Sequence, residues 1–140
     1  MNRTLGFDLG SKTLGVSVSD PLGMIARALT TLRFDSDDYD SALAQAQALI
    51  REQHADKVVL GLPCHMNGDI GVRGEISIAF KEKLESSGVE VVLWDERLTT
   101  VAANRILLQG DVSRKKRKKV IDQMAAVQIL QSYLDYSNRG

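Results

Sequence analysis

"TLGFDLGSKTLGVSVSD", residues 4–20, contains two runs of alternating apolar and small or polar residues on either side of a short turn at 11–13. The apolar members of the runs are Leu5, Phe7 and Leu9, followed by Leu14, Val16 and Val18. Two such runs around a turn predict a β-hairpin. Because successive side chains of a strand point to opposite faces, the apolar set would pack on one face and Asp8 would point to the other.

Two glycines, Gly6 and Gly10, flank Asp8 on its own face of the predicted strand. Glycine weakens a strand and is often found where a ligand or another backbone approaches closely. We therefore expect a cleared space around the Asp8 carboxylate. The same pattern also fits an aspartate that only pairs with a cation or faces solvent.

Length and composition predict one ordinary globular domain that spans 1–140. The chain has 140 residues, of which 44% are hydrophobic and 26% are charged, so it can bury a substantial core. The single cysteine, Cys64, excludes an internal disulfide and a multi-cysteine zinc site. No segment approaches the roughly 18 consecutive apolar residues of a membrane span, and the N-terminus lacks the apolar core of a signal peptide. These features predict a cytoplasmic protein without a membrane partner.

The basic residues are unevenly distributed, although the net charge is zero. The segment 114–119 is entirely basic and comprises Arg114, Lys115, Lys116, Arg117, Lys118 and Lys119. Without it, the chain has 12 basic and 18 acidic residues. A dense cationic segment joined to an acidic body favours contact with a polyanion such as nucleic acid. A solvated loop that keeps the protein in solution is the alternative interpretation.

After the hairpin, the sequence predicts a third strand and then alternating helices and strands. The expected strands are 24–34, 57–63 and 89–94. The expected helices are 36–55, a helix through Ile76, Phe80 and Leu84 after a loop at 64–71, a helix at 101–109 capped by Thr99 or Thr100, and a final helix at 120–136. The basic segment is expected to be a loop before that final helix. The first three strands have connections too short for crossovers and should be antiparallel, whereas the later strands should be parallel. The predicted fold class is α/β, a five-stranded mixed sheet flanked by helices on both faces.

Three further acidic residues occupy unusual positions. Asp95 and Glu96 are consecutive at the end of a predicted strand, so they would point to opposite faces and at most one would join Asp8. Strand parity alone does not choose between them. Asp122 lies in the first turn of the final helix. Its helical stripe continues through Ala126, Ile129 and Tyr133. Each of these acids would also suit a helix start, where it stabilises the helix dipole without any other function.

Taken together, these positions suggest carboxylates that converge from the first strand, the fifth strand and the final helix. Carboxylates in one cleft repel one another unless a cation lies among them. Oxygen ligands without histidine or cysteine clusters favour Mg²⁺ or Mn²⁺ over zinc. Such ions activate a water and stabilise the leaving oxygen of a phosphodiester, and the neighbouring basic segment would hold the polyanion in place.

Four motifs appear in order along the chain: "GFDLGSKTLGVSVSD", "VVLGLP" with a following "MNG", "WDERLTT", and "KxxDxxAAxxILxxYL". Over nearly the whole chain they resemble the YqgF/RuvX family, relatives of the RuvC Holliday junction resolvases in the ribonuclease H-like superfamily. The resemblance implies a ribonuclease H-like fold with sheet order 3-2-1-4-5. It also implies a metal-dependent endonuclease that processes the precursor of small-subunit (16S) ribosomal RNA, with structured RNA in a ribosomal subunit precursor as its partner.

The resemblance assigns roles residue by residue. Asp8, Glu96 and Asp122 match the catalytic, metal-binding carboxylates, while Lys12 and Arg97 match basic positions suited to phosphate contact. Gly61, Pro63 and Gly68 match the family's "GLP…G" segment, which the resemblance implies would shape the loop beside the substrate.

One feature departs from the resolvase relatives, which carry an acid on the fourth strand where "KVVLGLP" has none. Glu96 would have to substitute from the fifth strand, roughly 10 Å from the first at about 4.8 Å per strand. That separation is too large for direct contact, but two side chains would span it when joined through a metal, with or without an additional water.

Other functions compatible with these motifs remain as alternatives. One is a resolvase-like nuclease acting on DNA junctions, and another is a non-catalytic RNA-binding factor for ribosome assembly. The stretch "DLGSKT" also resembles the phosphate-binding hairpin of actin-like ATPases, but those proteins close two such domains around ATP. A monomer and a homodimer are equally compatible with the sequence.

Overall fold

The computed structural model describes residues 3–64, 70–99 and 114–138, with side chains of the last stretch described from 124 onward. Its elements in chain order are β1 (Arg3–Leu9), β2 (Thr13–Ser19), β3 (Ala26–Arg33), α1 (Tyr39–Glu52), β4 (Ala55–Leu62), α2 (Gly71–Glu85), β5 (Glu90–Asp95), the 3-10 helix η1 (Glu96–Leu98) and α4 (Arg114–Ser137). Each predicted element in these stretches is present, with ends that shift by a few residues. The predicted helix 101–109 lies outside the described residues.

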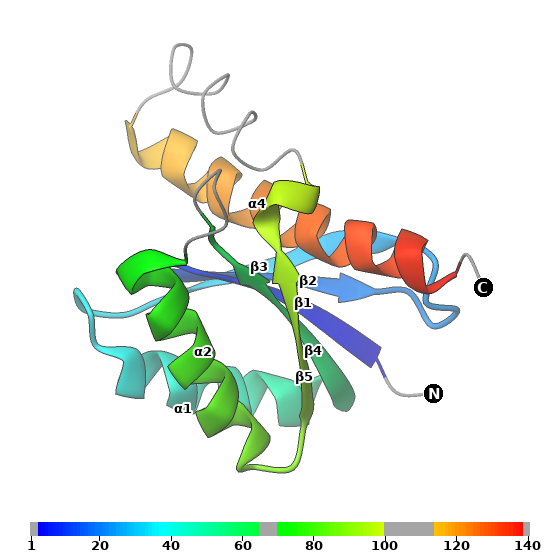
Figure 1. Cartoon of the computed structure of the whole chain (residues 1–140), viewed down its shortest axis with the longest axis horizontal. Helices are drawn as coiled ribbons and strands as arrows, with labels where there is room; N and C mark the ends of the chain where they lie inside the picture. Colours follow the sequence, from blue (N-terminus) through cyan, green and yellow to red (C-terminus); the bar gives the residue numbers. More distant parts are fainter. Residues whose placement is uncertain (1–2, 65–69, 100–113, 139–140) are drawn as a thin grey trace.

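The strands form one five-stranded sheet in the order β3-β2-β1-β4-β5. β1 pairs antiparallel with β2, and β2 pairs antiparallel with β3. β4 lies between β1 and β5 and is parallel to both. Helices α1 and α2 cover one face and α4 crosses the other (Figure 1). The predicted mixed sheet, its strand order and its two helical layers are therefore confirmed.

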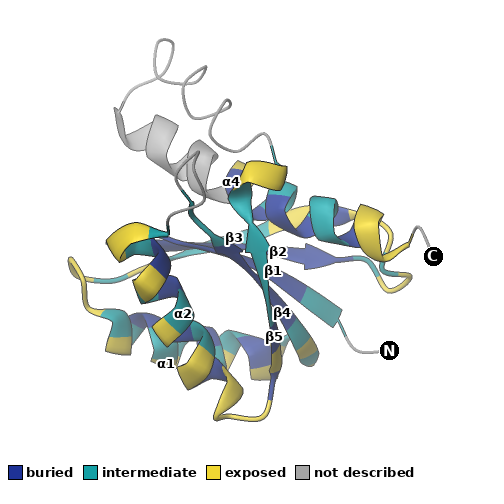
Figure 2. Cartoon of the chain, in the orientation of Figure 1, coloured by how far each residue is buried: buried dark blue, intermediate teal, exposed yellow. Residues whose placement is uncertain are grey.

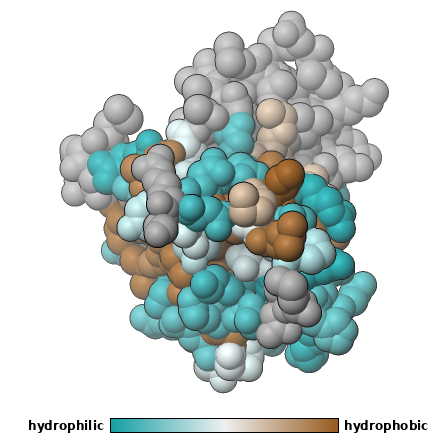
Figure 3. Space-filling model, turned by 90° about the vertical axis from the view of Figure 1, so that its right-hand side faces the viewer, coloured by the Kyte–Doolittle hydropathy of each residue, from teal (hydrophilic) through white to brown (hydrophobic). Residues whose placement is uncertain are grey.

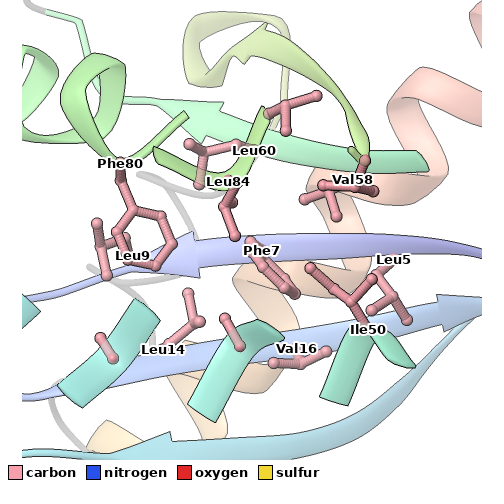
Figure 4. Packing of buried hydrophobic residues seen from close by; sticks show 14 of the residues in the cluster. Leu5, Phe7, Leu9, Leu14, Val16, Ile50, Val58, Leu60, Phe80 and Leu84 are labelled. Carbon is pink, nitrogen blue, oxygen red and sulfur yellow. The ribbon is translucent and has the colours of Figure 1, made fainter. Parts of the chain in front are cut away.

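The face under α1 and α2 carries a large apolar core. In the hairpin, its side chains are the predicted apolar set, including Phe7 and Val16, both fully buried. Figure 4 shows these strand side chains directed toward Ile50 of α1 and toward Phe80 and Leu84 of α2. Burial of this kind contributes about 25 cal/mol per Å² of apolar surface, so this face supplies much of the stability of the fold.

The opposite face carries a smaller apolar cluster beneath α4. It comprises Ala26, Val59, Ala125, Ile129, Leu130 and Leu134, with Trp94, Val127 and Tyr133 packed at its margin. Helix and sheet are also joined by a buried polar contact, in which Ser17 Oγ donates to the backbone oxygen of Ala126 at 2.7 Å. This layer is thinner because α4 packs directly on small residues of the sheet.

Gly6 explains how α4 comes so close to the sheet. A Cβ atom at this position would lie 2.7 Å from Leu130 Cβ and 2.9 Å from the backbone oxygen of Ala126. The expectation that Gly6 clears space for a ligand is therefore wrong, because the helix fills that space. Gly10 differs, since a Cβ there would meet only Thr13, at 3.2 Å from its backbone oxygen.

The basic segment 114–119 was expected to be a loop, and that expectation is wrong. Helix α4 begins at Arg114, six residues before the predicted start. Lysine and arginine are good helix formers, and no glycine or proline interrupts the segment. Repulsion between like charges one turn apart costs only a few tenths of a kcal/mol per pair, which is too little to prevent the helix.

Figure 2 shows that buried residues concentrate in the sheet and on the inward sides of the helices. On the face shown in Figure 3, apolar groups reach the surface in small areas between hydrophilic ones. The large exposed apolar side chains of the described residues include Leu22, Met24 and Ile25 between β2 and β3. None of the described helices is long and apolar enough to cross a membrane.

Candidate active site

Asp8 lies next to the last residue of β1, opposite Gly15 of β2. Its neighbours Phe7 and Leu9 point into the core under α1 and α2, so the Asp8 side chain points to the α4 face. Asp8 is only 5% exposed, although it is acidic. A buried carboxylate is stabilised by hydrogen bonds or by a neighbouring cation.

Glu96 opens η1 directly after β5, yet its carboxylate returns toward the middle of the sheet. A Cβ atom at Gly61 of β4 would lie 3.0 Å from Glu96 Oε2 and 2.5 Å from Ile129 Cδ1 of α4. The glycine therefore leaves room for the glutamate on the α4 face. A carboxylate that follows the fifth strand thus lies over the fourth strand, which carries no acid of its own at this end.

Asp8 and Glu96 share one edge of the sheet as well as one face. Phe7 of β1 pairs with Leu60 of β4, so Asp8 and Gly61 are the next residues on these neighbouring parallel strands. With Glu96 over Gly61, the two carboxylates enter the region at the carboxyl ends of β1 and β4. The Glu96 side chain thus extends over β4, which separates β5 from β1 in the sheet.

Asp95 has a different environment. Its carboxylate accepts hydrogen bonds from the backbone nitrogen of Arg97 at 2.9 Å and from Arg97 Nη2 at 2.7 Å, which caps η1. Hydrogen bonds from the Arg97 guanidinium lower the pKa of Asp95 below its ordinary value. Burial, with a smaller contribution from Asp95, raises the pKa of the neighbouring Cys64 thiol. Asp95 thus stabilises the turn after β5, and Glu96 is the acid on the α4 face.

The two single basic positions are placed differently around this edge. Lys12 is exposed in the turn between β1 and β2, four residues after Asp8. The Arg97 side chain is 40% exposed and is paired with Asp95. Any phosphate at Arg97 would share the guanidinium with that carboxylate.

Asp122 belongs to α4, but its side chain and those of the basic segment lie outside the described residues. The predicted stripe that follows Asp122 does face the sheet, because Ala126 and Ile129 are fully buried and Tyr133 packs at the margin. In the part of the chain with described side chains, no three histidine, cysteine or acidic residues are grouped closely enough to hold a metal. The third proposed ligand is not among those side chains.

The donor types at this edge suit a hard divalent cation. Asp8 and Glu96 themselves offer only oxygen atoms. The Cys64 thiol also lies at this end of β4, against Asp95, whereas His54 lies at the other end of β4, just before it begins. His65 and Gly68, which follow β4 in the sequence, lie outside the described residues. Oxygen-only donor sets favour Mg²⁺ or Mn²⁺.

Sequence reasoning missed Arg73 in the first turn of α2. Its Nη2 donates to the backbone oxygen of Leu9 at 3.1 Å, and its Nη1 donates to Tyr39 Oη at 2.9 Å. It also lines a cavity of about 220 Å³ with Pro63, Cys64, Ile70, Gly71 and Val72. A single arginine near a helix start carries no pattern that would have revealed these contacts.

Comparisons with known proteins show which proteins this chain is similar to. A family model described as "RuvX: Holliday junction resolvase" matches residues 2–136. The chain is 52% identical over 136 residues to a Staphylococcus epidermidis protein named "Putative pre-16S rRNA nuclease", covering 96% of each chain. A Bacillus subtilis protein of the same name is 53% identical over 137 residues, covering 97% of this chain and 99% of the relative.

Among solved structures, Thermus thermophilus RuvC in complex with a Holliday junction substrate aligns with a TM-score of 0.63. The alignment covers 99% of this chain and 98% of RuvC at 13% sequence identity, so it supports a shared resolvase-type fold. The family model and the relatives, by contrast, match the sequence itself over nearly its full length. The chain therefore belongs to the RuvX family.

Proposed function

We propose that this protein, acting as a single domain, is a nuclease that hydrolyses phosphodiester bonds in the precursor of small-subunit ribosomal RNA. The observation that carries the proposal is the position of the Glu96 carboxylate over Gly61, at the same end of the sheet as Asp8, the next-to-last residue of β1. Two carboxylates from different strands are thereby directed to one place. The names of the relatives, which cover nearly the whole chain, supply the substrate class.

Asp8, Glu96 and Asp122 would hold the divalent metal, Mg²⁺ or Mn²⁺. When bound, such a metal neutralises charge on the phosphate oxygens and makes a water acidic enough to supply a nucleophile. The buried position of Asp8 orients its oxygens, because a buried side chain has few alternative rotamers. Glu96 lies over Gly61, where the absence of a side chain leaves room for its carboxylate.

Phosphate contacts would surround this centre. Lys12 lies at the β1–β2 turn, and the basic residues 114–119 occupy the first turns of α4. Each phosphate neutralised by a lysine or arginine releases counterions, so RNA affinity should fall steeply with salt. Contacts with the backbone and shape of the RNA suit a chain with few aromatic residues.

A DNA junction is the second candidate substrate, and the description of the family model favours it. The deciding experiment offers the wild-type protein two labelled substrates, an RNA with the unprocessed end of small-subunit ribosomal RNA and a four-way DNA junction. Each is incubated with Mg²⁺, with Mn²⁺ and with a chelator. Metal-dependent cleavage of the RNA at a higher kcat/KM supports the proposal, whereas preferential cleavage of the junction supports resolution of DNA.

Binding of the RNA without cleavage, under all metal conditions and in the presence of ribosomal subunit precursors, would instead support a non-catalytic assembly factor. The added precursors matter because a missing partner would otherwise give the same result.

A further inference from the structure

Arg73 links three segments at the edge of the sheet that carries the proposed active site. From the first turn of α2, its Nη2 donates to the backbone oxygen of Leu9 at 3.1 Å. Leu9 directly follows Asp8 and is the last residue of β1. The guanidinium therefore holds the strand end on which the Asp8 carboxylate is carried.

The other terminal nitrogen of Arg73, Nη1, is connected through Tyr39 to the turn between β1 and β2. Arg73 Nη1 donates to Tyr39 Oη at 2.9 Å, and Tyr39 Oη donates to Asp37 Oδ1 at 3.0 Å. The backbone nitrogen of Asp37 then donates to the backbone oxygen of Ser11 at 2.7 Å. Asp37 has a φ of 60°, a left-handed conformation that aspartate tolerates when its neighbours hold it in place. Lys12 lies in the turn that this chain of contacts fixes.

The helix that carries Arg73 is itself attached to the end of β4. At Gly74, a Cβ atom would lie 3.2 Å from the backbone oxygen of Pro63, so α2 packs closely on the segment after β4. Gly61, over which Glu96 lies, is two residues before Pro63. Arg73 thus connects the end of β1, which carries Asp8, with the end of β4, over which Glu96 returns.

Arg73 acts from the side of the sheet opposite the carboxylates. Its partners, Leu9 and Tyr39, belong to the α1 and α2 side, whereas Asp8 and Glu96 point to the α4 side. Contact between Arg73 and the reacting phosphate is not needed for it to influence the reaction. The planar guanidinium serves two acceptors in different directions, which a lysine does not reproduce.

We propose that Arg73, with Tyr39, is a positioning residue that fixes the end of β1 and the following turn, and so sets where Asp8 and Lys12 meet the RNA. This inference rests on the proposed nuclease function. Catalytic carboxylates must be held to within about 0.5 Å, and a misplacement of about 1 Å costs roughly a hundredfold in rate.

The test compares the full-length wild-type protein with Arg73→Met, Arg73→Lys and Tyr39→Phe in cleavage of the RNA. Arg73→Met should lower kcat by about 100-fold and change KM by less than about threefold, because position and not binding is lost. Tyr39→Phe removes one hydroxyl and should lower kcat by about tenfold, and it keeps the test usable if Arg73→Met folds poorly. Arg73→Lys should be intermediate, since lysine reaches only one acceptor.

Lys81→Met is the matched control, because Lys81 is a cation on the same helix that pairs with Glu85 at 2.9 Å. Its kcat should stay within about twofold of wild type, since exposed pairs contribute little. Amide hydrogen exchange gives a reading independent of activity. In Arg73→Met and Tyr39→Phe, the Asp37 amide should exchange at least about tenfold faster, while amides in the middle of α1 stay unchanged.

An active wild type whose Arg73→Met variant retains its kcat would overturn the inference alone. A variant that raises KM while kcat is unchanged would also overturn it, because Arg73 would then contact the RNA directly. If the Asp37 amide exchanges its hydrogen at the wild-type rate in Arg73→Met and Tyr39→Phe, the inference would also be overturned. A wild type inactive on every substrate would overturn the proposed function and this inference with it.

Discussion

The two faces of the sheet are built for different purposes, although the same strands supply both. Toward α1 and α2, large apolar side chains such as Phe7 and Leu60 fill a continuous core. Toward α4, the same strands present Gly6, Asp8 and Gly61, and side chains and backbone of the helix come close to the two glycines. The first face supplies most of the apolar burial that stabilises the fold, and the second face carries the carboxylates proposed to act in the reaction.

The difference between the two faces is seen in two adjacent residues of β1. Phe7 and Asp8 are adjacent in β1, both almost completely buried, and point in opposite directions. A strand near the centre of a sheet can hold a carboxylate at a fixed place because the other face supplies the energy that keeps the strand in position. Substitutions on the two faces should therefore separate stability from activity.

The largest effect on stability is expected from Phe7→Ala on the α1 and α2 face. Removing a fully buried ring leaves a cavity, and such changes cost about 3–5 kcal/mol. Chemical denaturation followed by circular dichroism measures the free energy of unfolding. A loss below about 1 kcal/mol would contradict the view that this face carries the stability.

Gly6→Ala should be next, because it forces a side chain between the sheet and α4. The new Cβ would lie 2.9 Å from the backbone oxygen of Ala126, which moves only with the helix. Overpacking of this kind costs about 1–3 kcal/mol of unfolding free energy. Gly10→Ala is the control, since its new Cβ would approach only Thr13 and should cost less. Equal losses in the two variants would show that α4 does not pack as closely as described.

Gly61→Ala should affect activity more than stability. Its Cβ would lie 2.5 Å from Ile129 Cδ1 and 3.0 Å from Glu96 Oε2, which are the ends of side chains. Both can shift, so we expect a loss of about 1 kcal/mol in stability but a roughly tenfold loss of RNA cleavage as Glu96 is displaced. Denaturation and steady-state kinetics on the same protein measure both. Unchanged kcat would indicate that the position of Glu96 does not matter for the reaction.

The smallest effect is expected at Asp20, which belongs to neither face. Its Oδ1 accepts hydrogen bonds from the backbone nitrogens of Met24 at 2.7 Å and Ile25 at 2.9 Å. The bond from Ile25, followed by that from Met24, lowers the pKa of Asp20 in the folded state. Its contribution to stability is therefore present above the unfolded pKa of about 3.9 and is lost as the pH falls through the lower folded value.

Asp20→Ala tests this small effect in unfolding experiments at pH 7 and at about pH 2. The variant should be slightly less stable than wild type at pH 7, and the difference should shrink at the lower pH. A difference that is the same at both pH values would show that the ionised carboxylate is not what the turn requires.

Much of the fold could be predicted because one face of each early strand obeys a strict alternation. The apolar parity from Leu5 to Val18 determined the hairpin, and it also gave the direction of Asp8. What alternation does not reveal is the partner on the other face. Gly6 suggested an open space, but α4, more than a hundred residues later in the chain, fills it.

Strand alternation also could not predict which of Asp95 and Glu96 lies on the same face of the sheet as Asp8. The strand ends at Asp95 and a 3-10 helix begins at Glu96, so the alternation that would separate the two acids stops there. The start of α4 was mistaken because the basic segment was interpreted by its charge, whereas its residues are also good helix formers. Contacts such as those of Arg73 depend on three segments meeting and leave no local pattern.

The most direct test of the central claim is cleavage of the ribosomal RNA precursor by wild type and Asp8→Asn, with Mg²⁺ and with a chelator. The substitution keeps the size of the side chain, so the fold should be preserved, as denaturation of both proteins will verify. Cleavage should fall by about a thousandfold or more in the variant, corresponding to the several kcal/mol that metal-assisted charge stabilisation provides. The Kd for RNA should stay within about threefold of wild type or become tighter, because the phosphate contacts remain. Metal-dependent cleavage that persists at the wild-type rate in folded Asp8→Asn would contradict the account, because the carboxylate held at the end of β1 would then have no part in the reaction.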